Sequence, residues 1–261
     1  MAWLDDILGR TLVLAAHPDD ECLAFGALLQ RMREPLVVFA TNGSPVDPYF
    51  WQKHGSREAY AALRRQEALK SLHIAGVKDV VFLADMPGGE ELVDQELFRN
   101  LRTAYELLAD IVARRMVTGL LTLAYEGGHP DHDSCSVLAA QLSKLASIPC
   151  WEAALYHRNV DGSGAFQEFI EASADSIDVA PTNVEQERKR EMCAAYSSQG
   201  DFLQKFDVAR EIVRPQIAYD YSGPPHEGKT NYERWEWKMT AQEVSAAFAE
   251  FLQRVATHRA S

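Results

Sequence analysis

The chain has 261 residues, of which 47% are hydrophobic and 25% charged, so a disordered, collagenous or low-complexity protein is excluded. Lys and Arg total 26 against 38 Asp and Glu, and the formal net charge of −12 argues against a nucleic acid or an acidic lipid surface as a partner. The cysteines form no close pair, which fits neither a disulfide framework nor a cysteine zinc site, and we expect reduced thiols at Cys22, Cys135, Cys150 and Cys193.

The start of the chain differs from a targeting sequence. Asp5 and Asp6 stand where a signal peptide carries basic residues followed by an apolar stretch. No apolar run approaches the ~20 residues that a membrane span needs. We therefore expect a cytoplasmic protein with no integral membrane segment.

Short apolar runs alternate with amphipathic stretches along the first part of the chain. The apolar runs predict buried strands over residues 11–16, 35–41, 80–83, 119–124 and 151–156. Apolar residues at period 3.6 predict helices over residues 24–32, 56–71, 97–115 and 133–145. This alternation predicts an α/β fold whose mostly parallel sheet, within about residues 10–160, carries helices on both faces.

Residues 161–261 are less regular. Two further helices are predicted there, over residues 183–205 and 241–256. Arg214-Pro215 and residues 221–228 have the composition of turns and loops. Because no linker-like stretch separates this part, we expect a single domain over residues 1–261 with a C-terminal elaboration of helices and loops.

Two polar motifs follow two of the predicted strands. His17-Pro18-Asp19-Asp20-Glu21 comes directly after the first strand, and His129-Pro130-Asp131-His132-Asp133 comes shortly after the fourth. Ligands of open parallel sheets bind outside the carboxyl ends of strands, where the strand order reverses. If the first and fourth strands are neighbours, the two motifs face each other across one crevice.

The residue types of these motifs point to a metal. Imidazole and carboxylate together suit zinc or ferrous iron, and a catalytic zinc takes three protein ligands and leaves one position for water. His17 and Asp20 can converge on one ion, with His132 or His129 as the third ligand. Asp19 diverges from Asp20 and could act as general base on the water whose pKa the metal lowers.

The remaining motif residues then have supporting roles. If His132 is the ligand, His129 is free to stabilise an oxyanion or to protonate a departing amine. Asp131 completes the catalytic set as the group that fixes the tautomer of an imidazole. An alternative is that both loops are acid-rich helix starts, with Pro130 in the first helical position, but two such loops in one sheet are hard to obtain from capping alone.

The two motifs resemble those of the PIG-L/LmbE-like family of zinc-dependent de-N-acetylases. Further similarities are Thr41-x-Gly43, Arg64-x-x-Glu67 and Ser198-Gln199, so that the resemblance covers about residues 11–200. It implies a Rossmann-like fold and a Zn²⁺-dependent amide hydrolase that removes an N-acyl group, acetyl in the first instance. The implied substrate is a small molecule, an N-acyl amino sugar or a related conjugate.

The resemblance also implies individual roles. It makes His17, Asp20 and His132 the zinc ligands, Asp19 the general base and His129 the group that stabilises the tetrahedral intermediate or protonates the amine. Arg64 corresponds to an arginine near the substrate hydroxyls; its alternative is a helix-surface arginine paired with Glu58 or Glu67.

Other functions stay open at this point. A family member that has lost catalysis would only bind sugar, and two histidines with one carboxylate also occur in ferrous oxygenases. A nucleotide-binding sheet is disfavoured because no G-x-G-x-x-G follows the first strand. A homo-oligomer is compatible with the sequence.

The chain departs from the family near the second motif. Some members carry a tyrosine where this chain has Gly128, and Tyr125 is the nearest candidate to replace it. In the tail, His226, Tyr232 and Trp235 could line the substrate mouth or simply pack in a surface loop. These departures leave the identity of the substrate open.

Overall fold

The computed structural model describes residues 3–259, with the side chains of the last helix described as far as Thr257. Residues 1–2 and 260–261, which the predicted span 1–261 includes, lie outside the described residues. Among the described residues, no helix combines the length and the apolar character that crossing a membrane requires. The cytoplasmic location and a homo-oligomer stay predictions.

A seven-stranded sheet forms the centre of the molecule, in the order β3-β2-β1-β4-β5-β9-β8. Its parallel strands are β1 (Thr11–Ala15), β2 (Leu36–Phe39), β3 (Asp79–Phe82), β4 (Gly119–Leu123) and β5 (Cys150–Ala153). β9 (Ile212–Pro215) runs antiparallel to β5, and β8 (Ile177–Asp178) runs antiparallel to β9. A separate antiparallel pair consists of β6 (Tyr156–Arg158) and β7 (Gly164–Phe166).

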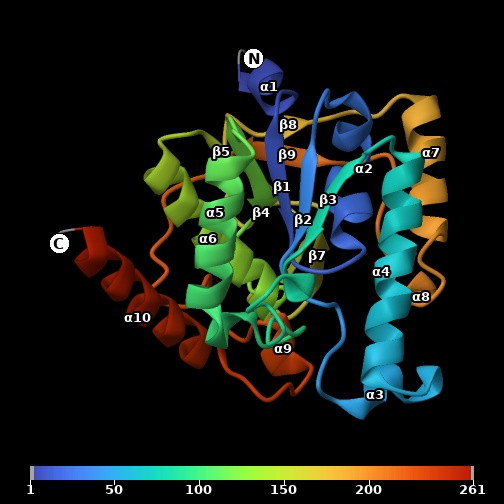
Figure 1. Ribbon diagram of the computed structural model, residues 1–261. Helices are drawn as coiled ribbons and strands as arrows, with labels where there is room; N and C mark the ends of the chain where they lie inside the picture. The colour runs from blue at the N-terminus through green and yellow to red at the C-terminus, as the bar shows by residue number, and fades with distance from the viewer. Residues whose placement is uncertain (1–2, 260–261) are drawn as a thin grey trace.

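Helices cover both faces of the sheet (Figure 1). One face carries α1 (Trp3–Ile7), α2 (Asp20–Arg31), α4 (Arg57–Ile74) and α7 (Asn183–Ala194), and the other α5 (Leu101–Arg114), α6 (Pro130–Ala146) and α10 (Ala241–Arg259). The short helices are α3 (Pro48–Trp51), α8 (Gly200–Leu203) and α9 (Asn231–Arg234), with the 3-10 turns η1 (Gln52–His54), η2 (Leu83–Asp85) and η3 (Leu97–Arg99).

The continuous apolar character of the strands follows from this two-sided burial. In β1, Leu12 and Leu14 point into the core beneath α5 and α6, whereas Val13 and Ala15 point into the core beneath α2. All residues of β1 are buried, as expected of a parallel strand covered on both faces. The predicted α/β fold with a mostly parallel sheet is therefore confirmed.

The predicted juxtaposition of the first and fourth strands is also confirmed. β1 pairs with β4 in parallel, with Leu12 opposite Leu120. The strand order reverses between these two strands, and their carboxyl ends lie at the edge of the sheet nearest α3 and α9, at the bottom of Figure 1. α2 and α6 begin at that edge, so their first turns are neighbours.

Three local predictions are wrong for identifiable reasons. The strand predicted over 151–156 ends at Ala153, and the chain then leaves the sheet because the N–H of Leu155 donates to Glu126 Oε2 (3.1 Å). The helix predicted over 183–205 is interrupted between α7 and α8, since Glu67 of α4 draws the intervening chain into a turn. Arg214-Pro215 belongs to β9, where the proline takes the last position of the strand.

A buried ion pair from the C-terminal part of the chain binds backbone groups in the middle of α2. Lys189 on α7 and Glu211 are 1% and 0% exposed, and Lys189 Nζ donates to Glu211 Oε1 (2.7 Å). Glu211 accepts the backbone N–H of Ala27 (2.6 Å), while Lys189 donates to the carbonyl of Leu23 (3.0 Å), so the pair engages backbone groups that a regular helix would join to each other. Gly26 permits this approach, because a Cβ there would lie 3.0 Å from Lys189 Cγ.

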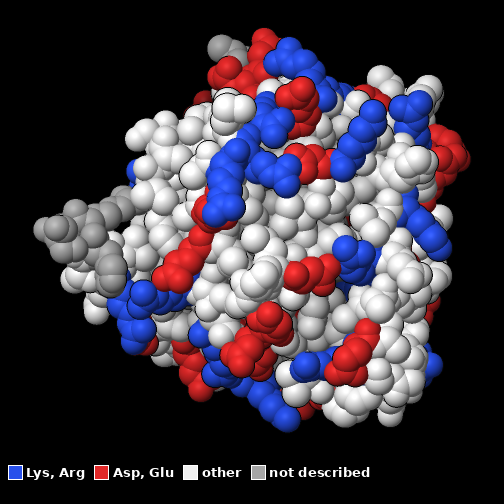
Figure 2. All heavy atoms as spheres, viewed as in Figure 1, with Lys and Arg blue, Asp and Glu red and all other residues white. Residues whose placement is uncertain are grey.

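Charges on the face seen in Figure 2 are mixed, with Lys and Arg interspersed among Asp and Glu. Exposed ion pairs of the protein include Arg115 with Asp79 (3.1 Å) and Arg102 with Glu106 (2.8 Å). Arg190 of the basic run in α7 pairs with Glu187 at 2.5 Å. Such exposed pairs contribute little to the free energy of unfolding, whereas loss of one partner of the buried Lys189–Glu211 pair is costly.

We expect Lys189→Met to lower the free energy of unfolding by about 3–5 kcal/mol, because it leaves the Glu211 carboxylate buried without its cation. Urea denaturation followed by circular dichroism measures the change. Arg190→Met, on the same helix but in an exposed pair, is the matched control and should cost less than about 1 kcal/mol. Equal losses in the two variants would contradict a structural role of the buried pair.

Candidate functional site

A cavity of about 890 Å³ opens at the carboxyl ends of β1 and β4. Polar side chains from both motifs form part of its lining: His17, Asp19, Asp20, His129 and His132. Arg64 from α4 and Asp94 from the segment before η3 join them, and aromatic side chains line the remainder. The two motifs predicted to face each other therefore do so.

Asp20 lies between two imidazoles. Its Oδ2 is 3.5 Å from His17 Nδ1, and its Oδ1 is 3.1 Å from His132 Nε2. The backbone N–H of His17 donates to Oδ2 (2.8 Å), which ties the carboxylate to the end of β1. Asp20 is the first residue of α2, and His132 lies in the first turn of α6, so the β1–β4 pairing brings the three together.

Asp131 lies behind His17 and outside the cavity. Its Oδ2 is 2.9 Å from His17 Nε2 and also accepts the backbone N–H of Gln95 (2.7 Å), while its Oδ1 accepts the N–H of Leu97 (3.0 Å). With Nε2 engaged by a carboxylate, His17 presents Nδ1 toward Asp20. Metal-binding histidines are oriented in this way by a second carboxylate.

The donors fit a cation in number and in charge. Three overlapping groups have ligand atoms within 4.8 Å of one another: His17, His129 and His132; His17, Asp94, His129 and Asp131; and His17, Asp19 and Asp20. Together with Asp20 between His17 and His132, they surround one small volume. Among the described residues of this cluster, buried carboxyl groups outnumber guanidinium groups, of which Arg64 is the one present. Such a surplus of buried negative charge favours a bound cation.

The direction of the pKa shifts agrees with this surplus. Burial alone would lower the pKa of His17, but Asp94, Asp131 and Asp20 outweigh it and hold that pKa well above its usual value. Burial likewise would raise the pKa of Asp20, but His132 and His17 lower it well below the usual range. The carboxylates around His17 therefore favour positive charge at that imidazole, as a surplus of buried carboxyl groups requires.

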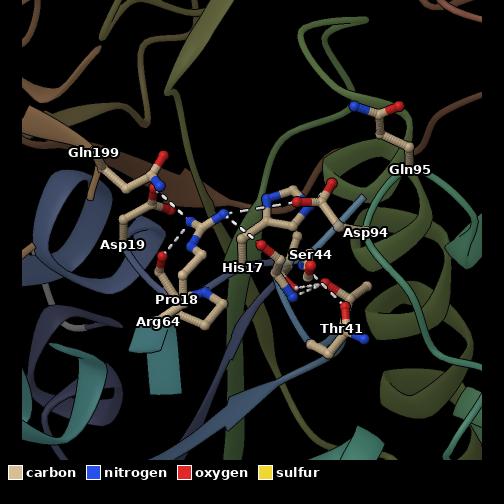
Figure 3. A network of polar contacts seen from close by, with 12 residues as sticks. His17, Pro18, Asp19, Thr41, Ser44, Arg64, Asp94, Gln95 and Gln199 are labelled. Atoms are coloured by element: carbon tan, nitrogen blue, oxygen red, sulfur yellow. Dashed lines mark hydrogen bonds and ion pairs between the residues drawn. The ribbon is translucent and has the colours of Figure 1, made fainter. Parts of the chain in front are cut away.

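Asp19 and Arg64 form the second polar contact of the site (Figure 3). Arg64 Nη2 donates to Asp19 Oδ2 (2.7 Å) and to the carbonyl of Pro18, and Nη1 donates to the carbonyl of Gly43 (2.8 Å). Burial raises the pKa of Asp19 to about 8, although the Arg64 guanidinium lowers it. The helix-surface alternative for Arg64 is wrong, because the side chain is buried and pairs with neither Glu58 nor Glu67 in this contact.

The backbone of Asp19 is strained. Its φ of 137° falls in the left-handed half of conformational space, which a non-glycine residue rarely adopts. Arg64 holds this conformation from one side through Pro18 and the carboxylate, and the Asp19 N–H donates to Glu21 Oε2 (3.0 Å) on the other. Strain of this kind concentrates at functional sites.

His129 caps α6 and thereby fixes its own tautomer. Its Nδ1 accepts the backbone N–H of Asp131 (3.1 Å), so the ring proton resides on Nε2, which is 3.4 Å from Asp94 Oδ1. Burial lowers the pKa of His129 to about 4, and the neighbouring His17 is the second cause of this shift. A neutral His129 with a proton on Nε2 is a hydrogen-bond donor toward the cavity.

Asp94 is a site residue that the sequence analysis missed. It contacts His17 Nε2 (3.3 Å), His129 Nε2 (3.4 Å) and Arg64 Nη1 (3.7 Å). Burial raises its pKa, but His17 and His129 outweigh burial and lower it. The one available signal was its place after the third strand, whose carboxyl end lies at the same edge of the sheet.

Both residues of Arg64-x-x-Glu67 bind chain segments that shape the site. Arg64 binds the first motif, whereas Glu67 accepts the Ser198 N–H (2.9 Å) and the hydroxyls of Ser197 (2.8 Å) and Ser198 (2.6 Å). The next residue, Gln199, lines the cavity and donates to the hydroxyl of Tyr60 (2.5 Å). The secondary similarities noted in the sequence thus meet around α4.

Tyr156, rather than Tyr125, occupies the space beside Gly128. A Cβ at Gly128 would lie 2.1 Å from the Tyr156 carbonyl oxygen and 3.0 Å from its ring. The Tyr156 ring packs at 5.3 Å against His132 and lines the cavity. Tyr125 packs into the core against Phe248, and its hydroxyl donates to the carbonyl of Gly223, so the suggested replacement is wrong.

The predicted tail residues divide between the cavity and its surroundings. Trp235 lines the cavity. Tyr232 is fully buried, with its hydroxyl 3.5 Å from Asp133, and His226 lies beside Gly127; neither is part of the cavity lining.

A family model described as PIG-L, GlcNAc-PI de-N-acetylase, matches residues 12–143, about half of the chain. The chain belongs to the PIG-L family. The match includes both motifs and confirms the resemblance that they predicted. With it, the predicted class of function, hydrolysis of an N-acyl group on an amino sugar or a related conjugate, is confirmed for this PIG-L protein.

Solved structures share the fold of this PIG-L protein. A triple mutant of a deacetylase from the teicoplanin biosynthetic pathway has a TM-score of 0.61 at 18% identity, covering 81% of this chain and 99% of that one. The A40926 pseudoaglycone deacetylase has a TM-score of 0.60 at 18% identity, covering 80% and 98%. A conserved protein of Thermus thermophilus, TT1542, has a TM-score of 0.50 at 17% identity, covering 80% and 96%. No curated protein matches the chain in sequence. The predicted Rossmann-like architecture is confirmed by these neighbours.

We expect Arg64→Met to lower the free energy of unfolding of the metal-free protein by about 3–5 kcal/mol, because the Asp19 carboxyl loses its buried partner. Thermal melting should show a midpoint lower by at least about 6 °C. The neighbouring Arg65 is exposed and pairs with Asp85 (2.6 Å), so Arg65→Met is the matched control and should shift the midpoint little. A midpoint unchanged in Arg64→Met would mean that Arg64 does not support the Asp19 loop.

Proposed function

We propose that this PIG-L protein is a zinc-dependent amide hydrolase that removes an N-acyl group, acetyl in the first instance, from an amino sugar or a related small conjugate. The observation that carries the proposal is Asp20 between His17 and His132 in a buried site with surplus negative charge. The structurally similar proteins described as deacetylases of teicoplanin biosynthesis and of the A40926 pseudoaglycone support the same activity.

The proposed zinc ligands are His17 through Nδ1, Asp20, and His132 through Nε2. When bound, zinc supplies a Lewis acid that polarises the acyl carbonyl and lowers the pKa of a water molecule. Two imidazoles and one carboxylate are a donor set that zinc accepts, with room for a substrate atom. Asp131 orients His17 by holding its other ring nitrogen.

Asp19 is the proposed general base. It follows Pro18 on the loop that ends at Asp20, lines the cavity, and is held by Arg64 rather than by the imidazoles. Its raised pKa in the metal-free protein favours the protonated acid, and a neighbouring positive charge lowers the pKa so that the carboxylate can accept a proton from water. The same group can later return that proton to the departing amine.

His129 is the proposed oxyanion donor. Because Nδ1 is occupied by the N–H of Asp131, only Nε2–H is available to the cavity, and a fixed donor of this kind stabilises charge that develops on the acyl oxygen. This geometry favours oxyanion stabilisation over protonation of the amine. Arg64 directs most of its donors to Gly43, Pro18 and Asp19, so we propose that it acts on substrate chiefly by placing Asp19.

We expect zinc to raise the thermal midpoint of the metal-free protein. A ligand that binds only the folded state at 100 times its Kd stabilises it by about 2.7 kcal/mol. Asp20→Asn should abolish this rise, whereas Asp85→Asn at an exposed position should preserve it. Because a structure of teicoplanin deacetylase is described as a zinc-inhibited form, zinc is titrated from substoichiometric amounts and acetate release is followed at each step.

Three outcomes would contradict the zinc proposal. A thermal midpoint that zinc leaves unchanged would contradict the proposed zinc ligands. Iron in elemental analysis together with oxygen consumption would indicate a ferrous enzyme. Sugar binding without release of a primary amine would indicate a member that has lost catalysis.

We expect Asp19→Asn to reduce kcat by about 10²–10⁴-fold, the usual effect of removing a general base. Release of a primary amine from N-acetylglucosamine glycosides measures turnover, and elemental analysis measures the metal in the same preparation. Asp85→Asn should retain full turnover. Lost metal in Asp19→Asn would make Asp19 a ligand, and retained turnover would refute the base assignment.

A further inference from the structure

Two tryptophans from the tail line the cavity. Trp235 and Trp237 lie between α9 and α10, outside the segment that matches the family model, and their rings are 5.1 Å apart. The intervening Glu236 has a φ of 57°, a left-handed conformation that a residue other than glycine seldom adopts. This turn lets two tryptophans only two residues apart both border the same cavity.

The indoles continue the row of rings that begins at the motif histidines. Trp237 packs edge-on against His129 with centroids 4.9 Å apart, and Trp235 lies 6.3 Å from Tyr156, which contacts His132 at 5.3 Å. The His129 and His132 rings are themselves 5.2 Å apart. The rings thus form a continuous wall from the polar centre to the mouth, so a group held by the indoles lies beside the group acted on at His129.

The wall is held rigidly. The N–H of Asn231 in α9 donates to the carbonyl of Gly127, one residue before Gly128 and the second motif, and Arg158 Nε donates to Asn231 Oδ1 (2.6 Å). The N–H of Trp237 donates to the carbonyl of Tyr232 (3.0 Å), which is fully buried. Because these contacts already fix the backbone, a ligand meets preorganised rings and little ordering is needed on binding.

Aromatic side chains of α3 lie across the mouth. Phe50 is 6.3 Å from Trp237, and Tyr49, which also lines the cavity, is 75% exposed. Trp235 is 36% exposed. Large aromatic side chains left exposed over a cavity indicate a ligand with apolar faces.

The cavity is larger than the polar centre requires. A volume of about 890 Å³ lies toward the upper end of the 300–1,000 Å³ typical of pockets for drug-sized ligands. Outside the polar centre, side chains of both signs line it, Lys205 and Lys238 together with Asp47, Glu96 and Glu236, so this part of the lining has no large excess of either charge. Size and aromatic lining together indicate a neutral ring next to the sugar.

We propose that Trp235 and Trp237 are specificity-determining residues that bind a flat, apolar ring face attached to the N-acyl amino sugar. The preferred substrate is then a glycoside of at least two rings, the second being a pyranose or an arene, and not a free monosaccharide. The proposal rests on the proposed function in one respect, that the acyl amide is hydrolysed beside His129.

The test compares three probes on the zinc-loaded enzyme: N-acetylglucosamine, N,N′-diacetylchitobiose and phenyl N-acetyl-β-glucosaminide. We expect kcat/KM to be at least about 10-fold higher for one or both two-ring probes, a difference of about 1.4 kcal/mol. Trp235→Ala should remove this preference, mainly by raising KM for the two-ring probes, while kcat/KM for the monosaccharide changes little. Trp237 also packs against His129, so Trp237→Ala should lower kcat/KM more for the two-ring probes than for the monosaccharide. Which two-ring probe is preferred identifies the second ring as a sugar or an arene.

Trp51→Ala is the matched control, because Trp51 ends α3 but does not line the cavity, and it should keep the preference. Circular dichroism verifies that each variant is folded. Equal kcat/KM values for all three probes would overturn the proposal, as would an equal loss on all three in the tryptophan variants, which would indicate a purely structural role.

Binding separates this proposal from the proposed function. Saturation-transfer NMR with phenyl N-acetyl-β-glucosaminide reports contact of its phenyl ring with the protein even when no acetate is released. If the phenyl ring contacts the wild type and this contact is lost in Trp235→Ala and Trp237→Ala, the two tryptophans bind the second ring whether or not hydrolysis occurs. The second ring of N,N′-diacetylchitobiose is examined in the same way. Absence of second-ring contact for both probes in the wild type would overturn the proposal, whereas absence of acetate release alone would overturn only the hydrolase.

Discussion

The parallel pairing of β1 with β4 is the constraint on which the candidate site depends. Each strand leads into a motif that supplies only part of the proposed ligand set, since His17 and Asp20 follow one strand and His132 follows the other. Hydrogen bonding between the strands places both ends at one edge of the sheet, where the strand order reverses. Successive apolar side chains of β1 point to opposite faces of the sheet, and both faces are buried. Polar side chains of the site can therefore stand only beyond the end of the strand.

Burying so much charge requires compensation, which comes from the imidazoles of the two motifs and from Arg64 outside them. Arg64 of α4 stabilises the loop that carries Asp19, and three residues later Glu67 binds the turn that leads to Gln199. Asp131 links His17 to the segment that contains Asp94. What remains after these contacts is a local excess of negative charge at the centre, where a cation would complete the balance.

Features of the fold and the site were predictable from the sequence where they depend on residues close together in the chain. A polar motif directly after an apolar run was readable, and so were the alternating strands and helices, because each depends on neighbouring residues. Asp94, Tyr156 and Trp237 reach the cavity only through long-range packing, and the one signal among them was the place of Asp94 after the third strand. The break after α7 likewise depends on Glu67, more than a hundred residues earlier, so helical periodicity over 183–205 was misleading.

The buried pair of Lys189 and Glu211 also shows that α2 depends on residues far along the chain. The family match ends at residue 143, within α6, yet Lys189 and Glu211 supply partners for backbone groups in the middle of α2. A fragment cut after α6 would expose the groove beside Gly26 and leave the N–H of Ala27 without its carboxylate. A fragment that keeps these contacts of α2 must therefore extend past Glu211.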